Sequence, residues 1–159
     1  MLELKRFDLQ SPREWERFAA LFSAYLTEVC DEDEYRENLA DLQNEALNRQ
    51  LIGQTLRKRN PYRVSQIVLD GECIGLISYS FHEEQHRGFL NNFYICPEYR
   101  NAGVGSAVYR MTEAELKAQG AVLIELAPVE KALPFYARHG FTPCRKNADG
   151  EMIYQKRIG

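Results

Sequence analysis

The sequence predicts an α/β fold in which a mixed, mostly antiparallel sheet is flanked by helices. Strand-like runs alternate with helical periods along the chain. Two Asp-Gly pairs, Asp70-Gly71 and Asp149-Gly150, mark hairpins between successive strands. A glycine-rich turn joins another strand to a long helix, as in a crossover between neighbouring parallel strands. Together these features predict helices packed on one largely antiparallel sheet.

The chain opens with a predicted strand and a predicted helix. Residues 2–8 (LELKRFD) alternate at their start, which predicts a short first strand. Ser11 can cap free backbone N–H groups, Pro12 suits the first helical position, and Glu14 completes a capping box. The helix that follows has one apolar face, formed at spacings of three and four by Trp15, Phe18, Phe22, Tyr25 and Val29.

The next elements are a second helix and three strands. Residues 31–52 continue a helical period after an acidic start, which suits the positive end of a helix dipole. Residues 62–81 predict two strands that are joined at Asp70-Gly71. Residues 89–95 (FLNNFYI) predict the fourth strand of the chain.

The last part of the chain alternates helices and strands. Residues 103–119 predict a helix, and 121–127 predict a buried fifth strand. A short helix is expected within 130–140, where Pro134 requires it to start late or bend. Residues 141–158 predict a strand, a hairpin and a last strand.

Length and charge limit the classes of function. We expect residues 1–159 to form a single domain, because a chain of 159 residues suits one core. The chain has 20 basic and 23 acidic residues and lacks a basic stripe, so no nucleic-acid partner is expected. It also lacks a signal peptide and an apolar run of roughly 18 residues, which predicts a cytoplasmic protein without a membrane partner. The sequence is compatible with a homodimer and does not decide between a monomer and a dimer.

Four single cysteines lack the Cys-x-x-Cys spacing of a zinc site or a redox pair. We therefore expect no metal, and we expect these thiols to be reduced and mostly buried. They are Cys30, Cys73, Cys96 and Cys144.

Residues 100–106 (RNAGVGS) stand between a strand and a helix and suggest a phosphate site. Free N–H groups converge there at the positive end of the helix dipole. The alternative is that the glycines only relieve backbone strain. A dinucleotide fingerprint would need a small residue at Val108, and a Walker loop would need a lysine and a hydroxyl residue at Ser106-Ala107. The pattern R-x-x-G-x-G fits in full.

Residues 91–116 (NNFYICPEYRNAGVGSAVYRMTEAEL) resemble the acetyl-CoA-binding motif of the GCN5-related N-acetyltransferase (GNAT) family. Residues 132–141 (ALPFYARHGF) resemble a later motif of that family, a helix with a tyrosine followed by Gly-Phe. The similarity covers roughly residue 62 to the C-terminus. It implies a GNAT-like acyl-CoA N-acyltransferase fold, with acetyl-CoA as the co-substrate.

The resemblance also implies which residues bind acetyl-CoA. Backbone groups at the end of the fourth strand would pair with the pantetheine arm, and N–H groups of the loop and first helical turn would hold the pyrophosphate. Val129 stands where many relatives have an asparagine that binds pantetheine. The implied cofactor-binding residues are Phe93, Tyr94, Ile95, Arg100, Asn101, Ala102, Gly103, Val104, Gly105, Ser106 and Ala132.

Tyr136 occupies the place of the family's general acid, which gives a proton to the departing thiolate of CoA. The alternative is a core aromatic residue. The fourth strand carries Asn91 and Asn92 where many relatives have acids, and amides cannot take up a proton. Asn92 therefore suits a positioning role. Glu83 is a candidate base in the turn before this strand, unless that turn is simply a solvated hairpin.

Three functions follow from the resemblance. The first is transfer of acetyl to a primary amine of a small molecule by direct attack in a ternary complex, and the second is acetylation of a protein or peptide amine. The third is CoA binding with little catalysis. An acidic segment could attract a cationic amine or could simply favour a helix start. It comprises Asp31, Glu32, Asp33 and Glu34.

Overall fold

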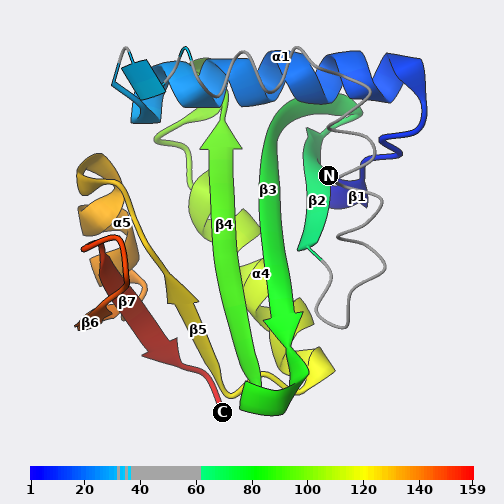
Figure 1. Ribbon diagram of the computed structural model, residues 1–159. Helices are drawn as coiled ribbons and strands as arrows, with labels where there is room; N and C mark the ends of the chain where they lie inside the picture. Colours follow the sequence, from blue (N-terminus) through cyan, green and yellow to red (C-terminus); the bar gives the residue numbers. More distant parts are fainter. Residues whose placement is uncertain (32, 35, 37–61) are drawn as a thin grey trace.

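The computed structural model describes residues 1–31, 33, 34, 36 and 62–159, which form a seven-stranded sheet with helices against it (Figure 1). The strand order is β1-β2-β3-β4-β5-β7-β6, and only β4 and β5 pair in parallel within this part of the chain. This confirms the predicted fold class. The strands are β1 (Leu2–Arg6), β2 (Tyr62–Leu69), β3 (Glu72–His82), β4 (Arg87–Ile95), β5 (Leu123–Leu126), β6 (Thr142–Lys146) and β7 (Met152–Arg157).

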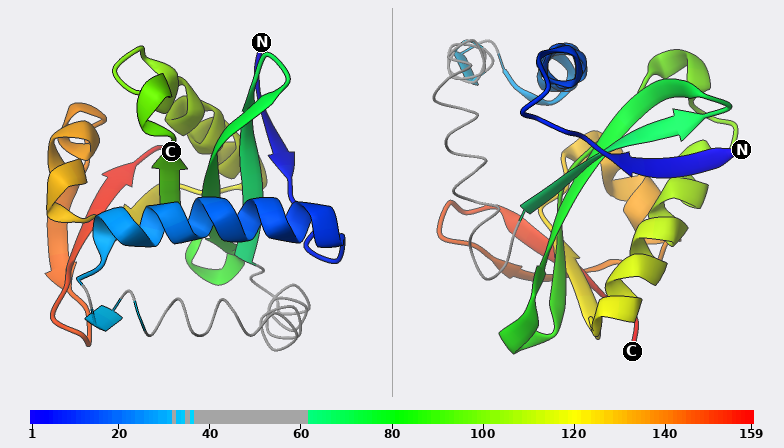
Figure 2. Two further views of the ribbon diagram at one scale, coloured as in Figure 1. Left: turned by 90° about the horizontal axis from the view of Figure 1, so that it is seen from above. Right: turned by 90° about the vertical axis from the view of Figure 1, so that its right-hand side faces the viewer.

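The helices α1 (Pro12–Val29) and α4 (Val104–Gln119) cover opposite faces of the sheet (Figure 2). Two successive residues of β3 explain this arrangement. Neighbouring side chains of a strand point to opposite faces of a sheet, so each face can bury a different helix. Leu76 is buried in the cluster that holds Trp15 and Phe18 of α1. Ile77 is buried in the cluster that holds Val108 of α4. The apolar period of each helix therefore meets its own face of the sheet.

Local signals set the ends of several elements. The N–H of Glu14 donates to Ser11 Oγ at 3.5 Å, so Ser11 caps α1 as predicted. Asp70 and Gly71 both have positive φ, at 50° and 86°, which matches the expected hairpin turn between β2 and β3. Helix α5 (Leu133–Arg138) starts late, so that Pro134 falls in its first turn.

Two expectations need comment. Most of the helix predicted over 31–52 lies outside the described residues, as does most of its apolar period. The cysteines are free, as expected, but the prediction that they are mostly buried was wrong. Cys144 is exposed because it lies on the edge strand β6, and Cys30 is partly exposed because it follows the last turn of α1. Cys73 and Cys96 are also only partly buried.

Within the described residues, no helix combines the length and apolar character required to cross a membrane.

Candidate active site

The two parallel strands of the sheet separate along their length. Residues 87–90 of β4 pair with residues 123–126 of β5. Beyond this point β4 continues to Ile95, while β5 ends and the chain turns away through Pro128 (Figure 1). Within the described residues no strand covers this edge of β4 after Leu90. The sequence was consistent with this opening, since prolines follow both strands.

A bulge reorients β4 where the opening begins. Ser78 of β3 lies opposite Asn92, whereas the next residue, Tyr79, lies opposite Leu90. Asn91 is therefore the extra residue of the bulge, and its side chain is exposed. The bulge determines which backbone groups beyond it face the opening.

Those backbone groups can be assigned from two hydrogen bonds. The N–H of Cys96 donates to Ile74 O at 2.8 Å, so the groups of Cys96 and, by alternation, Tyr94 face β3. Phe93 and Ile95 face the opening. The carbonyl of Ile95 is already occupied, because it accepts from Arg100 Nε at 2.7 Å. The N–H and C=O of Phe93 and the N–H of Ile95 are then the groups at this edge that a bound molecule can pair with.

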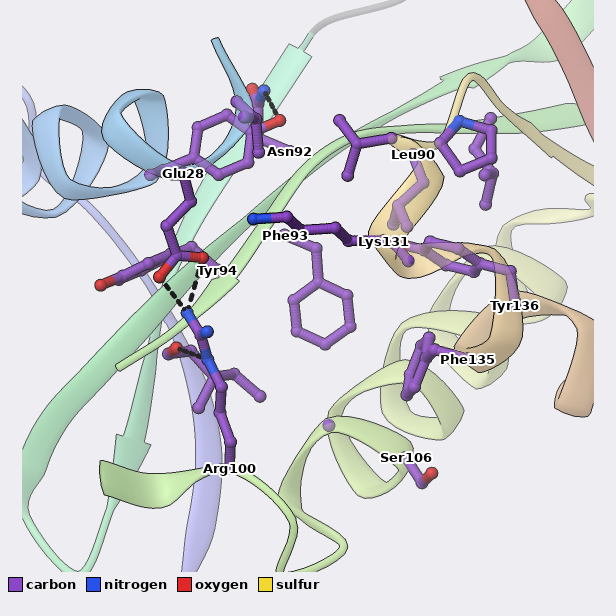
Figure 3. Close-up of a pocket in the computed structure, with 18 of the residues that line it drawn as sticks. Glu28, Leu90, Asn92, Phe93, Tyr94, Arg100, Ser106, Lys131, Phe135 and Tyr136 are labelled. Carbon is purple, nitrogen blue, oxygen red and sulfur yellow. Dashed lines mark hydrogen bonds and ion pairs between the residues drawn. The ribbon is translucent and has the colours of Figure 1, made fainter. Parts of the chain in front are cut away.

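The opening leads into a cavity of ≈ 460 Å³ between α1, the glycine loop and α5 (Figure 3). Most of the predicted site residues line it. Ala102 and Val104 do not, although they belong to the same loop and first helical turn. The predicted residues that line the cavity are Asn92, Phe93, Tyr94, Ile95, Arg100, Asn101, Gly103, Gly105, Ser106, Ala132 and Tyr136.

Glu83 does not line this cavity. It lies in a 3₁₀ turn, η1 (Glu83–Gln85), that precedes β4, whereas the cavity is at the far end of that strand (Figure 1). Glu83 and Asn92 are near in sequence, but an extended strand advances about 3.3 Å per residue and separates them.

The glycine loop forms an uncapped helix start at the cavity. Gly103 is the N-cap of α4 with φ 79°, and in the described structure no side chain caps this turn. Gly105 lies two residues further along, in the first turn of α4, where a Cβ would stand 3.4 Å from the ring of Phe135. Free N–H groups at the positive end of a 16-residue helix fit a pyrophosphate. Ser106 Oγ lies 3.0 Å from His139 Nε2 on the same wall.

Arg100 connects three parts of the site. Its Nη2 donates to both carboxylate oxygens of Glu28, at 2.8 and 2.9 Å, while its Nε holds the carbonyl of Ile95. Its guanidinium also lies 5.3 Å from the ring centre of Tyr94. Arg100 therefore ties the loop to the last turn of α1 and to the end of β4.

Asn92 is held at both ends of its amide. Its Oδ1 accepts from Ser78 Oγ at 2.9 Å, and its Nδ2 donates to the hydroxyl of Tyr25 at 3.2 Å. Burial raises the pKa of Tyr25, and the bond from Asn92 offsets part of that rise. Asn92 thus positions Tyr25, which lines the cavity from α1.

Tyr136 is buried in the wall that α5 contributes, with only 7% of the residue exposed. Its ring packs edge-on against Phe135 and Phe141, at centroid distances of 5.1 and 5.5 Å. Burial raises the pKa of its hydroxyl, and Tyr25 adds to the rise. The phenol therefore stays protonated at neutral pH.

Among the residues that line the cavity, four with polar or charged side chains were given no site role in the predictions from sequence. Tyr25 was assigned to the apolar face of the first helix, where its spacing fits. Glu28 lies near the end of that helix without any motif around it, and Lys131 and Arg138 flank the tyrosine helix as ordinary surface cations. The positive charges of Lys131 and Arg138 were the only signal in the sequence that could have indicated a role for them near a predicted phosphate site.

A parallel strand pair that opens beside an uncapped, glycine-rich helix start is suited to bind an acyl-CoA, and a buried phenol lies in the same cavity. These features are those of an acyl-CoA-dependent acyltransferase. Residues 15–141 match the model of the Acetyltransferase (GNAT) family, and the chain belongs to that family. It is an acetyl-CoA-dependent N-acetyltransferase, an enzyme class that acts on amine acceptors.

Solved structures share this fold at low sequence identity. The PaiA N-acetyltransferase from Thermoplasma acidophilum in complex with coenzyme A has a TM-score of 0.73 and 16% identity, over 99% of each chain. Tetrahymena GCN5 has a TM-score of 0.73 and 12% identity, over 99% of this chain and 96% of its own. Aminoglycoside 6'-acetyltransferase type Ii has a TM-score of 0.68 and 15% identity, over 100% of this chain and 97% of its own. No curated protein sequence matches the chain.

Proposed function

We propose that this enzyme acetylates a primary amine of a small molecule by direct attack in a ternary complex. The observation that carries the proposal is Glu28, which is the one carboxylate among the described residues that line the cavity. A carboxylate at the α1 side favours a cationic acceptor. An enzyme of similar fold bears the name aminoglycoside 6'-acetyltransferase, which is consistent with a small acceptor.

The proposed acetyl-CoA site uses backbone more than side chains. Phe93 offers an N–H and a C=O to the pantetheine arm, and the first turn of α4 offers N–H groups to the pyrophosphate. Arg100 adds positive charge to this part of the cavity. Val129, which lines the cavity, offers no amide to the pantetheine, so backbone contacts carry the binding.

In the proposed reaction the neutral amine attacks the acetyl carbonyl carbon, the C–S bond breaks, and the thiolate takes the proton of Tyr136. Burial suits Tyr136 to this task, because its raised pKa keeps the proton in place until a strong base, the thiolate, forms beside it. Once the bound pyrophosphate draws Arg100 away from it, Glu28 is the cavity carboxylate that can receive the amine's charge and its proton. Asn92 contributes by holding Tyr25 in the acceptor wall.

Acetylation of a protein amine and CoA binding without turnover are the competing functions. Tyr25, Glu28 and Val29 of α1 form one wall of the cavity, and a wall at this position favours a compact acceptor over an extended peptide. Val129 and the two asparagines of β4 are the features that favour a binding module, and Tyr136 is the feature that opposes it.

The test is a thermal-shift titration with acetyl-CoA, followed by a thiol-release assay over small amines and lysine peptides. Stabilisation by acetyl-CoA, with release that depends on a small cationic amine, would support the proposal. Release with peptides alone would favour a protein acceptor. Stabilisation without release for any amine would favour the binding module, and no stabilisation would exclude the acetyl-CoA site.

A further inference from the structure

Lys131 reaches into the cavity from the wall that also carries Tyr136. It lies in a 3₁₀ turn, η3 (Glu130–Ala132), that leads directly into α5. Its side chain extends across the cavity, and its amino group points toward the side formed by Glu28 and Asn92 (Figure 3). A primary amine of the protein itself therefore occupies the acceptor side of the proposed site.

The backbone that carries this amine is held in place. The N–H of Ala132 donates to Val129 O at 3.0 Å and closes the turn, and α5 continues from it without a break. The Lys131 side chain, in contrast, makes no hydrogen bond or ion pair with the part of the chain that the structure describes. The backbone at Lys131 is fixed, and its four-carbon side chain is long enough and flexible enough to bring the amine into the cavity that the residue lines.

The amine of Lys131 and the proposed general acid, Tyr136, could act from different sides of a bound acetyl group. Tyr136 belongs to the wall of α5, while the amino group of Lys131 points across to the opposite wall (Figure 3). Direct attack requires a nucleophile that approaches the carbonyl carbon from a side other than that of the departing sulfur. An acetyl group held at the edge of β4 would lie between the two.

We propose that Lys131 is a self-acetylation site, an acceptor that the enzyme carries in its own cavity; this inference rests on the proposed function. The neutral amine of Lys131 attacks the acetyl carbonyl carbon, so that a C–N bond forms and the C–S bond breaks. The thiolate takes the proton of Tyr136, the amine gives up its surplus proton to solvent, and the Tyr136 phenolate takes one proton back from solvent. The products are Nε-acetyl-Lys131 and CoA with a free thiol.

The step has two consequences for the enzyme. Because the amine is tethered beside the co-substrate, the reaction is intramolecular and its rate constant does not depend on protein concentration. Acetylation also removes one cation from the cavity and leaves an amide in the acceptor space. Turnover of small amines then slows as the modification accumulates.

The experiment incubates the full chain with acetyl-CoA alone and follows acetylation by intact mass and peptide mapping. Lys117 is the internal control for chemical acetylation, because it is exposed near the end of α4 and does not line the cavity. We expect Lys131 to be acetylated at least tenfold faster than Lys117, at a rate constant unchanged over a tenfold range of protein concentration. Tyr136→Phe should slow the reaction at Lys131 at least tenfold and leave Lys117 unchanged.

Three results would overturn the inference. They are equal rates at Lys131 and Lys117, a Lys131 rate that rises with protein concentration, and a Lys131 rate that is unaffected by Tyr136→Phe. Any of these together with normal thiol release to added amines would leave the proposed function intact. Loss of thermal stabilisation by acetyl-CoA would instead count against the proposed function itself. Lys131→Arg keeps the charge and should abolish the fast modification, while the slow acetylation of Lys117 stays the same.

Discussion

Arg100 holds the carboxylate of Glu28 through one nitrogen, Nη2, which lies 2.8 and 2.9 Å from its two oxygens. The pair links the last turn of α1, on the proposed acceptor side of the cavity, to the loop on the proposed phosphate side. Any anion that draws Arg100 toward the loop would leave Glu28 free to face the cavity. The two halves of the site are therefore connected by one ion pair.

Replacing Glu28 with Gln tests the acceptor role. Both partners of the ion pair are more than a third exposed, so we expect the free energy of unfolding to change by less than about 1 kcal/mol. The KM for a cationic amine should rise about tenfold, because one charge-assisted hydrogen bond is lost, while the KM for acetyl-CoA changes much less. Steady-state kinetics with each substrate varied checks this. Glu16→Gln, exposed on the same helix, is the control, and equal acceptor KM values in both variants would refute the role.

Removing the hydroxyl of Tyr136 tests the general acid. Tyr136→Phe keeps the packed ring and should lower kcat about 100-fold, the effect of losing one acid catalyst, with the thermal shift by acetyl-CoA unchanged. Since burial raises the pKa of Tyr136, we expect any alkaline loss of activity that this group causes to lie above its ordinary pKa of about 10. Tyr154→Phe, on β7, is the matched control. A Tyr136→Phe enzyme with full kcat would mean that the tyrosine only packs.

The two glycines of the loop should respond differently to alanine. Gly103 has φ 79°, so Gly103→Ala should cost about 1 kcal/mol of stability through backbone strain, although its Cβ would meet nothing within 4 Å. Gly105 has an ordinary helical backbone, and its Cβ would make a normal contact with Phe135 at 3.4 Å. Gly105→Ala should therefore keep the melting temperature of the free protein.

The same two variants separate stability from binding. Gly105→Ala places a methyl group at the cavity wall and should weaken acetyl-CoA binding about tenfold by hindering close approach to the first turn of α4. Melting curves with and without acetyl-CoA measure both quantities. Unchanged acetyl-CoA affinity in Gly105→Ala would show that the phosphates do not approach this turn.

Glu125 of β5 should make stability depend on pH. Its carboxylate is buried between Arg87, 2.7 Å away, and Arg145, whose Nη1 also contacts it. Burial alone would raise the pKa of Glu125, but the hydrogen bonds from Arg145 and Arg87 outweigh it and hold the pKa below the ordinary value. Stability from a lowered pKa is present at neutral pH and is lost as pH falls through the folded-state value.

Glu125→Gln should therefore lower the free energy of unfolding at pH 7 by about 1 to 3 kcal/mol, as expected for loss of hydrogen bonds to a charged group. The difference from the parent should shrink near pH 3, where the parent carboxylate becomes protonated. Urea unfolding at both pH values measures this, with Glu3→Gln on the exposed side of β1 as the control. A difference of equal size at both pH values would contradict the linkage.

Local chemistry explains what was predictable from the sequence. Ser11, the Asp70-Gly71 turn and the glycine loop act through backbone angles and caps that neighbouring residues determine. Each could therefore be predicted from the sequence alone. The resemblance to the family was recognised from the same kind of short-range pattern, around the loop and Tyr136.

The remaining site residues depend on tertiary contacts. Glu28 and Arg100 are 72 residues apart, and only the packing of α1 across the end of β4 brings them together. Glu83 shows the opposite error, because nearness in sequence to Asn92 becomes distance along an extended strand. Tyr25 has the spacing of a core residue, and the opening of the sheet beneath it could not be derived from that spacing.

The edge of β4 beyond Leu90 also has a consequence for solubility. An exposed strand edge can recruit strands from other molecules and seed aggregation. Here the unpaired stretch is short, a bulge disrupts its start at Asn91, and the guanidinium of Arg100 caps the carbonyl of Ile95 at its end. Within the described residues this edge stays accessible to the proposed pantetheine arm, yet it offers a neighbouring chain no continuous row of hydrogen-bond partners.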